Sequence, residues 1–259
     1  MSNVASYFSL GSGNSRNDIA LFGVECEIES VNSDETNWTL FDGIEVKDDP
    51  SLRNHGRELV WYGPKPYEQS KQLFKNLHAN LKVFSPEQRF SERTSTHVHV
   101  NCRGLSTAAV VNLVRMYALY EELVFMCVDK SRRDNIYCVP LVDTHLTALY
   151  GSTDLSTLVS RWHKYTAFNL KRLSDLGTVE FRHLQGTDDP ELFNNWLLLL
   201  EKMFHLAQRE TISPDSLTET NVQNWADMLF GHFPFYRFVR SNVPNIVSNS
   251  LIDIKLGFI

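Results

Sequence analysis

Strict alternation of apolar and polar positions marks three segments of the chain, residues 21–29, 94–102 and 178–184. A period of two is the pattern of a β-strand with one buried and one polar face. A shorter candidate, residues 58–62, ends at Gly63 and Pro64, which favour a turn. The pattern therefore predicts a sheet with one apolar face and one face rich in polar side chains.

Other segments follow helical spacing. Leu73, Leu77 and Leu81 recur four apart within residues 66–84, and Ser106 is suited to cap a helix that runs to about residue 128. A shorter helix is predicted over residues 155–173. Asp188 or Asp189 before Pro190 predicts a helix start, with the helix reaching about residue 208.

After a break at residues 213–215, the pattern predicts one or two more helices and a final apolar segment, residues 252–259. Residues 32–45 have turn chemistry around short apolar runs. Strands and helices do not alternate regularly, which favours an α+β fold with an antiparallel β-sheet and helices packed on one face. We expect a flexible N-terminal arm over residues 1–18, a catalytic domain over 19–210, and a C-terminal helical extension of that domain over 211–259.

The polar faces of the predicted strands carry acids, imidazoles and a guanidinium, namely Glu25, Glu27, Glu29, Glu58, His97, His99, Glu180 and Arg182. Taken alone, each face could be the solvent side of a half-buried strand. Together they favour one shared site, because three carboxylates at period two repel one another unless cations lie between them. Oxygen ligands dominate, which favours magnesium or manganese over zinc.

Arg182 follows Glu180 on the same face, where it could neutralise a phosphoryl group or simply form an ion pair with Glu180.

Composition and charge limit the classes of partner that the protein is expected to bind. The 259 residues include 42% hydrophobic side chains and carry a formal net charge of -6 without a basic block, which argues against a nucleic-acid partner. The longest apolar run, residues 196–200, is far shorter than a membrane span, so no membrane partner is expected. Four scattered cysteines and a start without a leader pattern indicate a cytoplasmic protein.

Several of these motifs, in this order, resemble those of the amidoligases, carboxylate–amine ligases with a catalytic fold like that of glutamine synthetase and glutamate–cysteine ligase. The motifs are residues 23–27, 49–52 with 56–60, 96–101, 178–182 with 186–187, and the residues Arg161, Tyr165 and Asn169. Many such enzymes are carried by bacteriophages and bacteria. One departure is Pro50, where the family more often has glycine.

The resemblance implies roles for individual residues. Glu25, His97 and Glu180 would hold the metal ion that bridges the terminal phosphates of ATP. Glu27 and Glu58, with Asp49, would hold a second ion nearer the substrate carboxylate. His99 and Asn101 would contact the nucleotide phosphates, Arg182 the transferred phosphoryl group, and Arg161 a substrate carboxylate or phosphate.

The implied function is an ATP-dependent carboxylate–amine ligase that uses two Mg²⁺ (or Mn²⁺) ions and an acyl-phosphate intermediate. Its substrates would be a small-molecule or peptide carboxylate and an amine, in the host cytoplasm if the protein is phage-encoded. Glu29 is one candidate base for the amine proton. The alternatives are a metal-dependent hydrolase using His97, His99, Glu25 and Glu27, a phosphotransferase, or a non-catalytic phage or host interaction protein.

Overall fold

The computed structural model describes residues 2–11, 13–31, 38, 41–144 and 154–257. Six strands form one sheet in the order β2-β3-β1-β4-β6-β5, and every neighbouring pair is antiparallel. The strands are β1 (Phe22–Ile28), β2 (Ile44–Asp48), β3 (Arg57–Trp61), β4 (Ser95–Asn101), β5 (Phe168–Asn169) and β6 (Thr178–Gln185). The predicted α+β class with an antiparallel sheet is confirmed.

The period-two pattern corresponds to the two faces of the sheet. On β1, Phe22, Val24 and Cys26 are buried in the hydrophobic core, and Glu25 and Glu27 line a cavity on the opposite face. All seven residues of β4 are buried, so this strand is covered on both sides. The polar side chains of β4 are therefore enclosed within a site.

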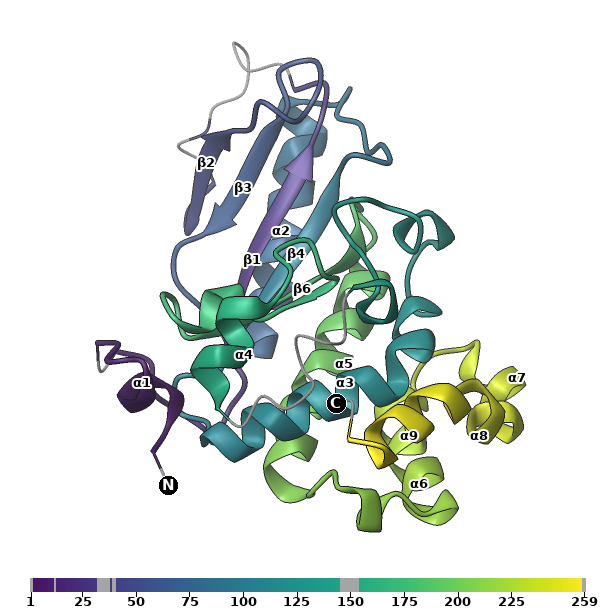
Figure 1. The fold of residues 1–259 in the computed structure, drawn as a ribbon. Coiled ribbons are helices and arrows are strands. Elements are labelled where there is room, and N and C mark those ends of the chain that lie inside the picture. Colours follow the sequence, from purple (N-terminus) through teal and green to yellow (C-terminus); the bar gives the residue numbers. More distant parts are fainter. Residues whose placement is uncertain (1, 12, 32–37, 39–40, 145–153, 258–259) are drawn as a thin grey trace.

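Helices cover the apolar face of the sheet (Figure 1). The long ones are α2 (Tyr67–Phe84), α3 (Thr107–Phe125) and α5 (Pro190–Arg209). Phe74 of α2 stacks on Phe193 of α5 with ring centroids 3.9 Å apart, and Trp61 of β3 meets Phe193 edge-on at 5.8 Å. These aromatic contacts join two helices to the sheet.

The predicted caps of the two central helices are in place. The Ser106 side chain accepts a hydrogen bond from the Ala109 amide at the start of α3. Asp189, rather than Asp188, caps α5 by accepting from the amides of Glu191 and Leu192. Each cap satisfies backbone donors that have no partner within the helix.

The predicted helix over residues 155–173 is wrong beyond its first two turns. Helix α4 (Leu155–Arg161) is followed by Trp162, whose indole Nε1 donates to the Phe168 carbonyl at 2.8 Å. Phe168 and Asn169 then form β5 and pair with β6. This pairing gives hydrogen-bond partners to backbone groups on the outer edge of β6. Strand pairing, rather than the local helical spacing, therefore decides the conformation here. Strand β2 was also not predicted.

The first residues contact the domain closely. Helix α1 (Val4–Tyr7) has a fully buried Val4, and the amides of Val4 and Ala5 donate to the carbonyls of Leu105 and Arg103. At least the start of the segment expected to be a flexible arm therefore packs against the loop before α3.

The C-terminal residues are helical, as expected, but in more pieces: α6 (Glu219–Phe230), α7 (Tyr236–Val239), α8 (Val243–Ile246) and α9 (Ser248–Lys255). They lie beside α3 and α5, away from the strands (Figure 1). Buried Tyr120 of α3 donates to the Val222 carbonyl of α6 at 2.7 Å. The predicted apolar segment 252–259 falls partly in α9, and residues 258–259, like most of the predicted turn region 32–45, lie outside the described residues.

Among the described residues, no helix combines the length and the apolar character that crossing a bilayer requires.

Candidate active site

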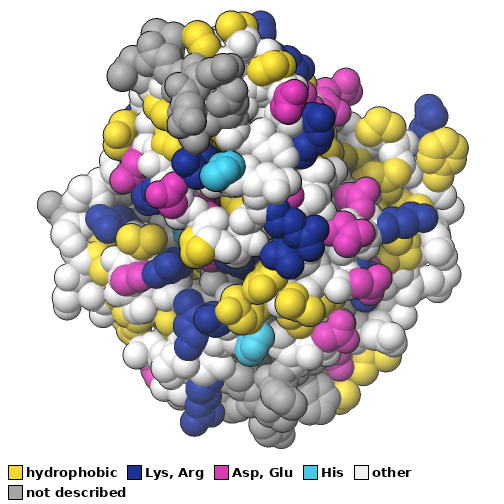
Figure 2. Space-filling view, turned by 90° about the horizontal axis from the view of Figure 1, so that it is seen from above, with side chains coloured by type: hydrophobic (Ala, Val, Ile, Leu, Met, Phe, Trp, Pro, Cys, Tyr) yellow, Lys and Arg dark blue, Asp and Glu magenta, His cyan; other side chains and the backbone are white. Residues whose placement is uncertain are grey.

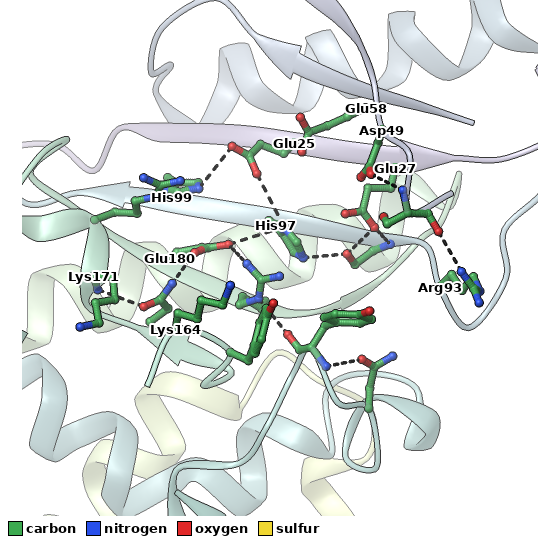
Figure 3. Close-up of a pocket in the computed structure, with 18 of the residues that line it drawn as sticks. Glu25, Glu27, Asp49, Glu58, Arg93, His97, His99, Lys164, Lys171 and Glu180 are labelled. Carbon is green, nitrogen blue, oxygen red and sulfur yellow. Dashed lines mark hydrogen bonds and ion pairs between the residues drawn. The ribbon is translucent and has the colours of Figure 1, made fainter. Parts of the chain in front are cut away.

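A cavity of about 500 Å³ opens on the polar face of the sheet (Figure 3). Five acids reach it from three strands and one loop: Glu25, Glu27, Asp49, Glu58 and Glu180. His97 and His99 lie between the acids of β1 and β6. The structure thus brings together every predicted metal ligand.

Strand register explains this assembly. Glu25 is directly opposite His97, and His99 is directly opposite Glu180. Glu27 is directly opposite Glu58 on the other side of β1. Residues far apart in sequence therefore meet because antiparallel pairing places them in adjacent positions on one face.

The first candidate metal cluster comprises Glu25, His99 and Glu180, whose ligand atoms all lie within 4.8 Å of one another. His99 Nε2 lies 3.5 Å from Glu25 Oε1 and has no hydrogen-bond partner among the described residues. His97 Nδ1 lies 3.6 Å from Glu25 Oε2 and 3.5 Å from Glu180 Oε1. His99, expected to contact phosphate, is therefore placed as well as His97 to be a ligand.

The second candidate cluster comprises Glu27, Asp49 and Glu58. Glu27 Oε2 accepts hydrogen bonds from the Ser95 amide at 2.8 Å and from its hydroxyl at 2.7 Å. Asp49 accepts from the Ser51 amide at 2.8 Å, so this loop orients the carboxylate despite Pro50. The cross-strand pair of Glu27 and Glu58 is a like-charge contact that a bound cation would relieve.

Electrostatics differ between the two clusters. Burial alone would raise the pKa of Glu25, but the imidazoles of His97 and His99 lower it well below its usual range. Burial together with the charges of Glu25 and Glu27 raises the pKa of Glu58 to about 7. Neighbouring imidazoles thus lower the pKa of an acid in the first cluster, whereas neighbouring carboxylates raise the pKa of an acid in the second.

The pKa values of Glu180 and His99 follow the same pattern. Burial opposes ionisation of both, but the charges of His97 and Arg182 lower the pKa of Glu180, and Glu25 raises that of His99. Asn169 of β5 donates to Glu180 Oε2 at 2.7 Å and so orients this carboxylate.

Basic side chains surround the acids. Arg182 forms an ion pair with Glu180 Oε1, and its Nε donates to the Tyr137 carbonyl at 2.8 Å. Five cations that the hydrophobic pattern does not predict also line the cavity: Arg93, Arg132, Lys164, Lys171 and Arg172. They come from loops and short turns that have no period, so only the motif resemblance pointed to their neighbourhood, through Tyr165 and Asn169.

Arg132 is almost fully buried and holds its loop against β6. Its Nε donates to the His183 carbonyl at 3.0 Å and its Nη2 to the Arg182 carbonyl at 2.8 Å. Burial lowers the pKa of Arg132, although the guanidinium remains a cation at neutral pH.

The family model described as "Putative amidoligase enzyme" matches residues 62–204, more than half of the chain. The chain belongs to the amidoligase family. No curated protein matches the sequence.

The family match covers β4 and β6, and with them His97, His99, Glu180 and Arg182. It begins after Glu25, Glu27 and Glu58. The structure connects these earlier acids to the matched part, because β1 and β3 join the same sheet.

Three residues singled out from the sequence lie outside the acidic cavity. Arg161 is exposed at the end of α4 and does not line the cavity. Asn101 lies at an adjoining cavity, where its Nδ2 donates to the Asn14 carbonyl at 2.8 Å. Glu29 also does not line the main cavity, and its Oε1 accepts a hydrogen bond from the Arg53 amide. Its position therefore does not support a role as the base that takes the amine proton.

Proposed function

We propose that this protein is an ATP-dependent ligase that joins a carboxylate to an amine, with an acyl phosphate as intermediate and two Mg²⁺ or Mn²⁺ ions as cofactors. The observation that carries the proposal is the pair of acidic clusters in one cavity, side by side and bordered by Arg182 and other cations. Membership of the amidoligase family supports the reaction class.

The two clusters fit divalent cations. His99 Nε2 is a buried nitrogen without a hydrogen-bond partner among the described residues, and it faces two carboxylates. Glu27, Asp49 and Glu58 supply only oxygen atoms, which suits a hard cation. Glu25, His99 and Glu180, with His97 beside them, would hold one ion, and Glu27, Asp49 and Glu58 the other. Bound there, the ions would neutralise phosphate and carboxylate charge.

The two ends of the cavity suit different reactants. Lys164 and Lys171 lie at the Glu180 end, and Arg93 lies beyond Glu27 and Asp49 at the other end (Figure 3). The lysines, together with Arg172, would bind the phosphates of ATP through charge-assisted hydrogen bonds. Arg93, whose Nη1 donates to the Ser51 carbonyl at 2.9 Å, would hold the substrate carboxylate near the second cluster.

Arg182, which lines the cavity and forms an ion pair with Glu180, would contact the transferred phosphoryl group. In the first step a carboxylate oxygen of the substrate bonds to the γ-phosphorus and ADP leaves. In the second step the amine nitrogen bonds to the acyl carbon, the amine loses a proton, and phosphate leaves. Both steps bring anions together, so positive charge fixed in the cavity lowers their barriers.

Small substrates suit this site better than a nucleic acid does. Acidic and basic side chains are interspersed over the face seen from above, and among its described residues they form no continuous basic stripe (Figure 2). A long phosphate backbone would require such a stripe.

The test is an ADP-release screen against amino acids, polyamines and short peptides, with mass spectrometry of the products. We expect ADP release to require a carboxylate, an amine and Mg²⁺ or Mn²⁺ together, and product masses to equal the sum of the substrates minus water. Glu180→Ala should abolish the signal, and Glu87→Ala, at an exposed position outside the cavity, should not. Hydrolysis products formed without ATP would instead establish a metal-dependent hydrolase, and a phosphorylated acceptor a phosphotransferase.

A further inference from the structure

A second cavity, of about 350 Å³, adjoins the first and shares Glu25 and His99 with it. Its wall differs in character from that of the acidic cavity. Val60 faces it from β3, directly opposite Glu25 in the strand register, and Pro64 and Leu176 complete an apolar lining. A ligand could therefore extend from the acidic cavity past His99 into an apolar pocket.

Gly23 makes part of this space. It occupies a polar-face position of β1, opposite His99, where every other such position of the strand carries a glutamate. Its backbone does not require glycine, because its φ is not positive and an added Cβ would meet only His99 Cβ at an ordinary 3.5 Å. Glycine inside a strand weakens the strand and often marks the close approach of a ligand. The missing side chain thus serves the cavity rather than the fold.

Away from His99 and Glu25, which also line the acidic cavity, most polar side chains around this cavity bind backbone groups. Arg103 donates from Nη1 to the carbonyls of Gly11 and Gly13 and from Nε to that of Leu176. Asn101 donates to the Asn14 carbonyl and accepts from the Arg103 amide. These bonds hold the N-terminal loop as one wall, and Arg103, the one cation among the lining residues that the structure describes, is directed to that loop. The pocket therefore suits a neutral, flat, largely apolar group.

We propose that this second cavity binds the heterocyclic base of the nucleotide. The inference rests on the proposed use of ATP. In this orientation the base lies beside Gly23, Val60 and Leu176, and the phosphates extend past His99 to the Glu25–His99–Glu180 cluster. The Glu27–Asp49–Glu58 end of the acidic cavity is then left for the carboxylate substrate. Thr178 lines the second cavity and interacts through Oγ1 with Nδ1 of His99, which lines both cavities, at 3.0 Å.

The experiment compares two probes, MgATP and magnesium tripolyphosphate, by isothermal titration calorimetry on the full chain. Tripolyphosphate carries the phosphates without a base. Gly23→Leu should weaken MgATP binding about tenfold or more, because the leucine fills the pocket, and should leave tripolyphosphate binding unchanged. Gly23→Ala, which adds one methyl group, should give a smaller loss of MgATP affinity in the same direction.

A second variant separates loss of base binding from a folding defect that a substitution in β1 could cause. Leu176 is 47% exposed, so Leu176→Ala should not affect folding, and it should weaken MgATP binding several-fold without changing tripolyphosphate binding. Leu256→Ala, at a 64% exposed leucine near the C-terminus, is the matched control and should bind both probes like the wild type.

Two results would overturn the assignment of the base. One is unchanged MgATP affinity in folded Gly23→Leu and Leu176→Ala; the other is an equal loss for both probes. Failure of the proposed use of ATP looks different, because the wild-type protein would then bind neither probe in the presence of Mg²⁺.

Discussion

Replacing Glu58 by glutamine should stabilise the metal-free protein while weakening its response to metal. Burial and the charges of Glu25 and Glu27 raise the pKa of this carboxyl from 4.5 to about 7. The folded state thus holds the proton more tightly than the unfolded state does. Its contribution to stability is fully present below about pH 4.5 and is lost as the pH rises to about 7. Glutamine resembles the protonated carboxyl and has no such loss.

The magnitude follows from the two pKa values. A difference of that size corresponds to about 3 kcal/mol for a fully buried group. Glu58 is only half-buried, so solvent screening reduces the expected gain to about 1–2 kcal/mol. At pH 8 in EDTA the midpoint of thermal unfolding should rise by roughly 2–8 °C for a chain of this size.

The assay is thermal and urea unfolding of wild type and Glu58→Gln at pH 4.5 and pH 8, with EDTA or with excess Mg²⁺. Metal binding stabilises a protein by mass action, so Mg²⁺ should raise the wild-type midpoint more than that of the variant. Glu87→Gln, at an exposed glutamate, controls for the loss of one surface charge. If Glu58→Gln has the same advantage at pH 4.5 as at pH 8, or none at either, the charge repulsion argued for this cluster is wrong.

Three further predictions address other parts of the molecule. Arg182→Ala should lower ADP release about a thousandfold, whereas Arg161→Ala should leave it unchanged because Arg161 does not line the cavity; equal losses would restore Arg161 to the site. Asn169→Ala should weaken Mn²⁺ binding about tenfold in calorimetry, because Glu180 loses an orienting donor, and unchanged affinity would count against that role. Burial lowers the pKa of His78 to about 4, so protonation favours unfolding and wild-type stability should fall by up to about 3 kcal/mol between pH 6.5 and 4. His78→Leu should flatten this decline in urea titrations, and an unaltered pH profile would show that His78 is not its source.

The spacing of apolar residues along the chain predicts most of the main strands and helices, because that spacing is regular within each of them. The alternation in β1, β4 and β6 placed Glu25, Glu27, His97, His99 and Glu180 on polar faces, and the structure has them there. The caps at Ser106 and Asp189 were equally readable, since a cap depends on a few adjacent residues. Prediction failed where pairing with a distant strand decided the conformation, as at Phe168 and Asn169.

The candidate site was predicted only in part for a related reason. Period-two spacing could show that acids and imidazoles lie on polar faces, but not which residues face one another across strands. Register decided that Glu27 opposes Glu58 and that His99 opposes Glu180. The cations Arg93, Lys171 and Arg172 come from segments without a period, so no pattern could place them in the cavity.

By itself, then, the sequence determined the two-faced strands, the main helices and the chemical kinds of side chain available, because these depend on residues close together in the chain. The family resemblance already implied two groups of acids, but tertiary structure alone decided that His99 joins Glu25 and Glu180, that Arg161 and Glu29 lie outside the cavity, and that an apolar pocket lies beside Gly23. Each of these depends on contacts between strands and loops that are distant in sequence, where register and packing, rather than local preference, set the distances.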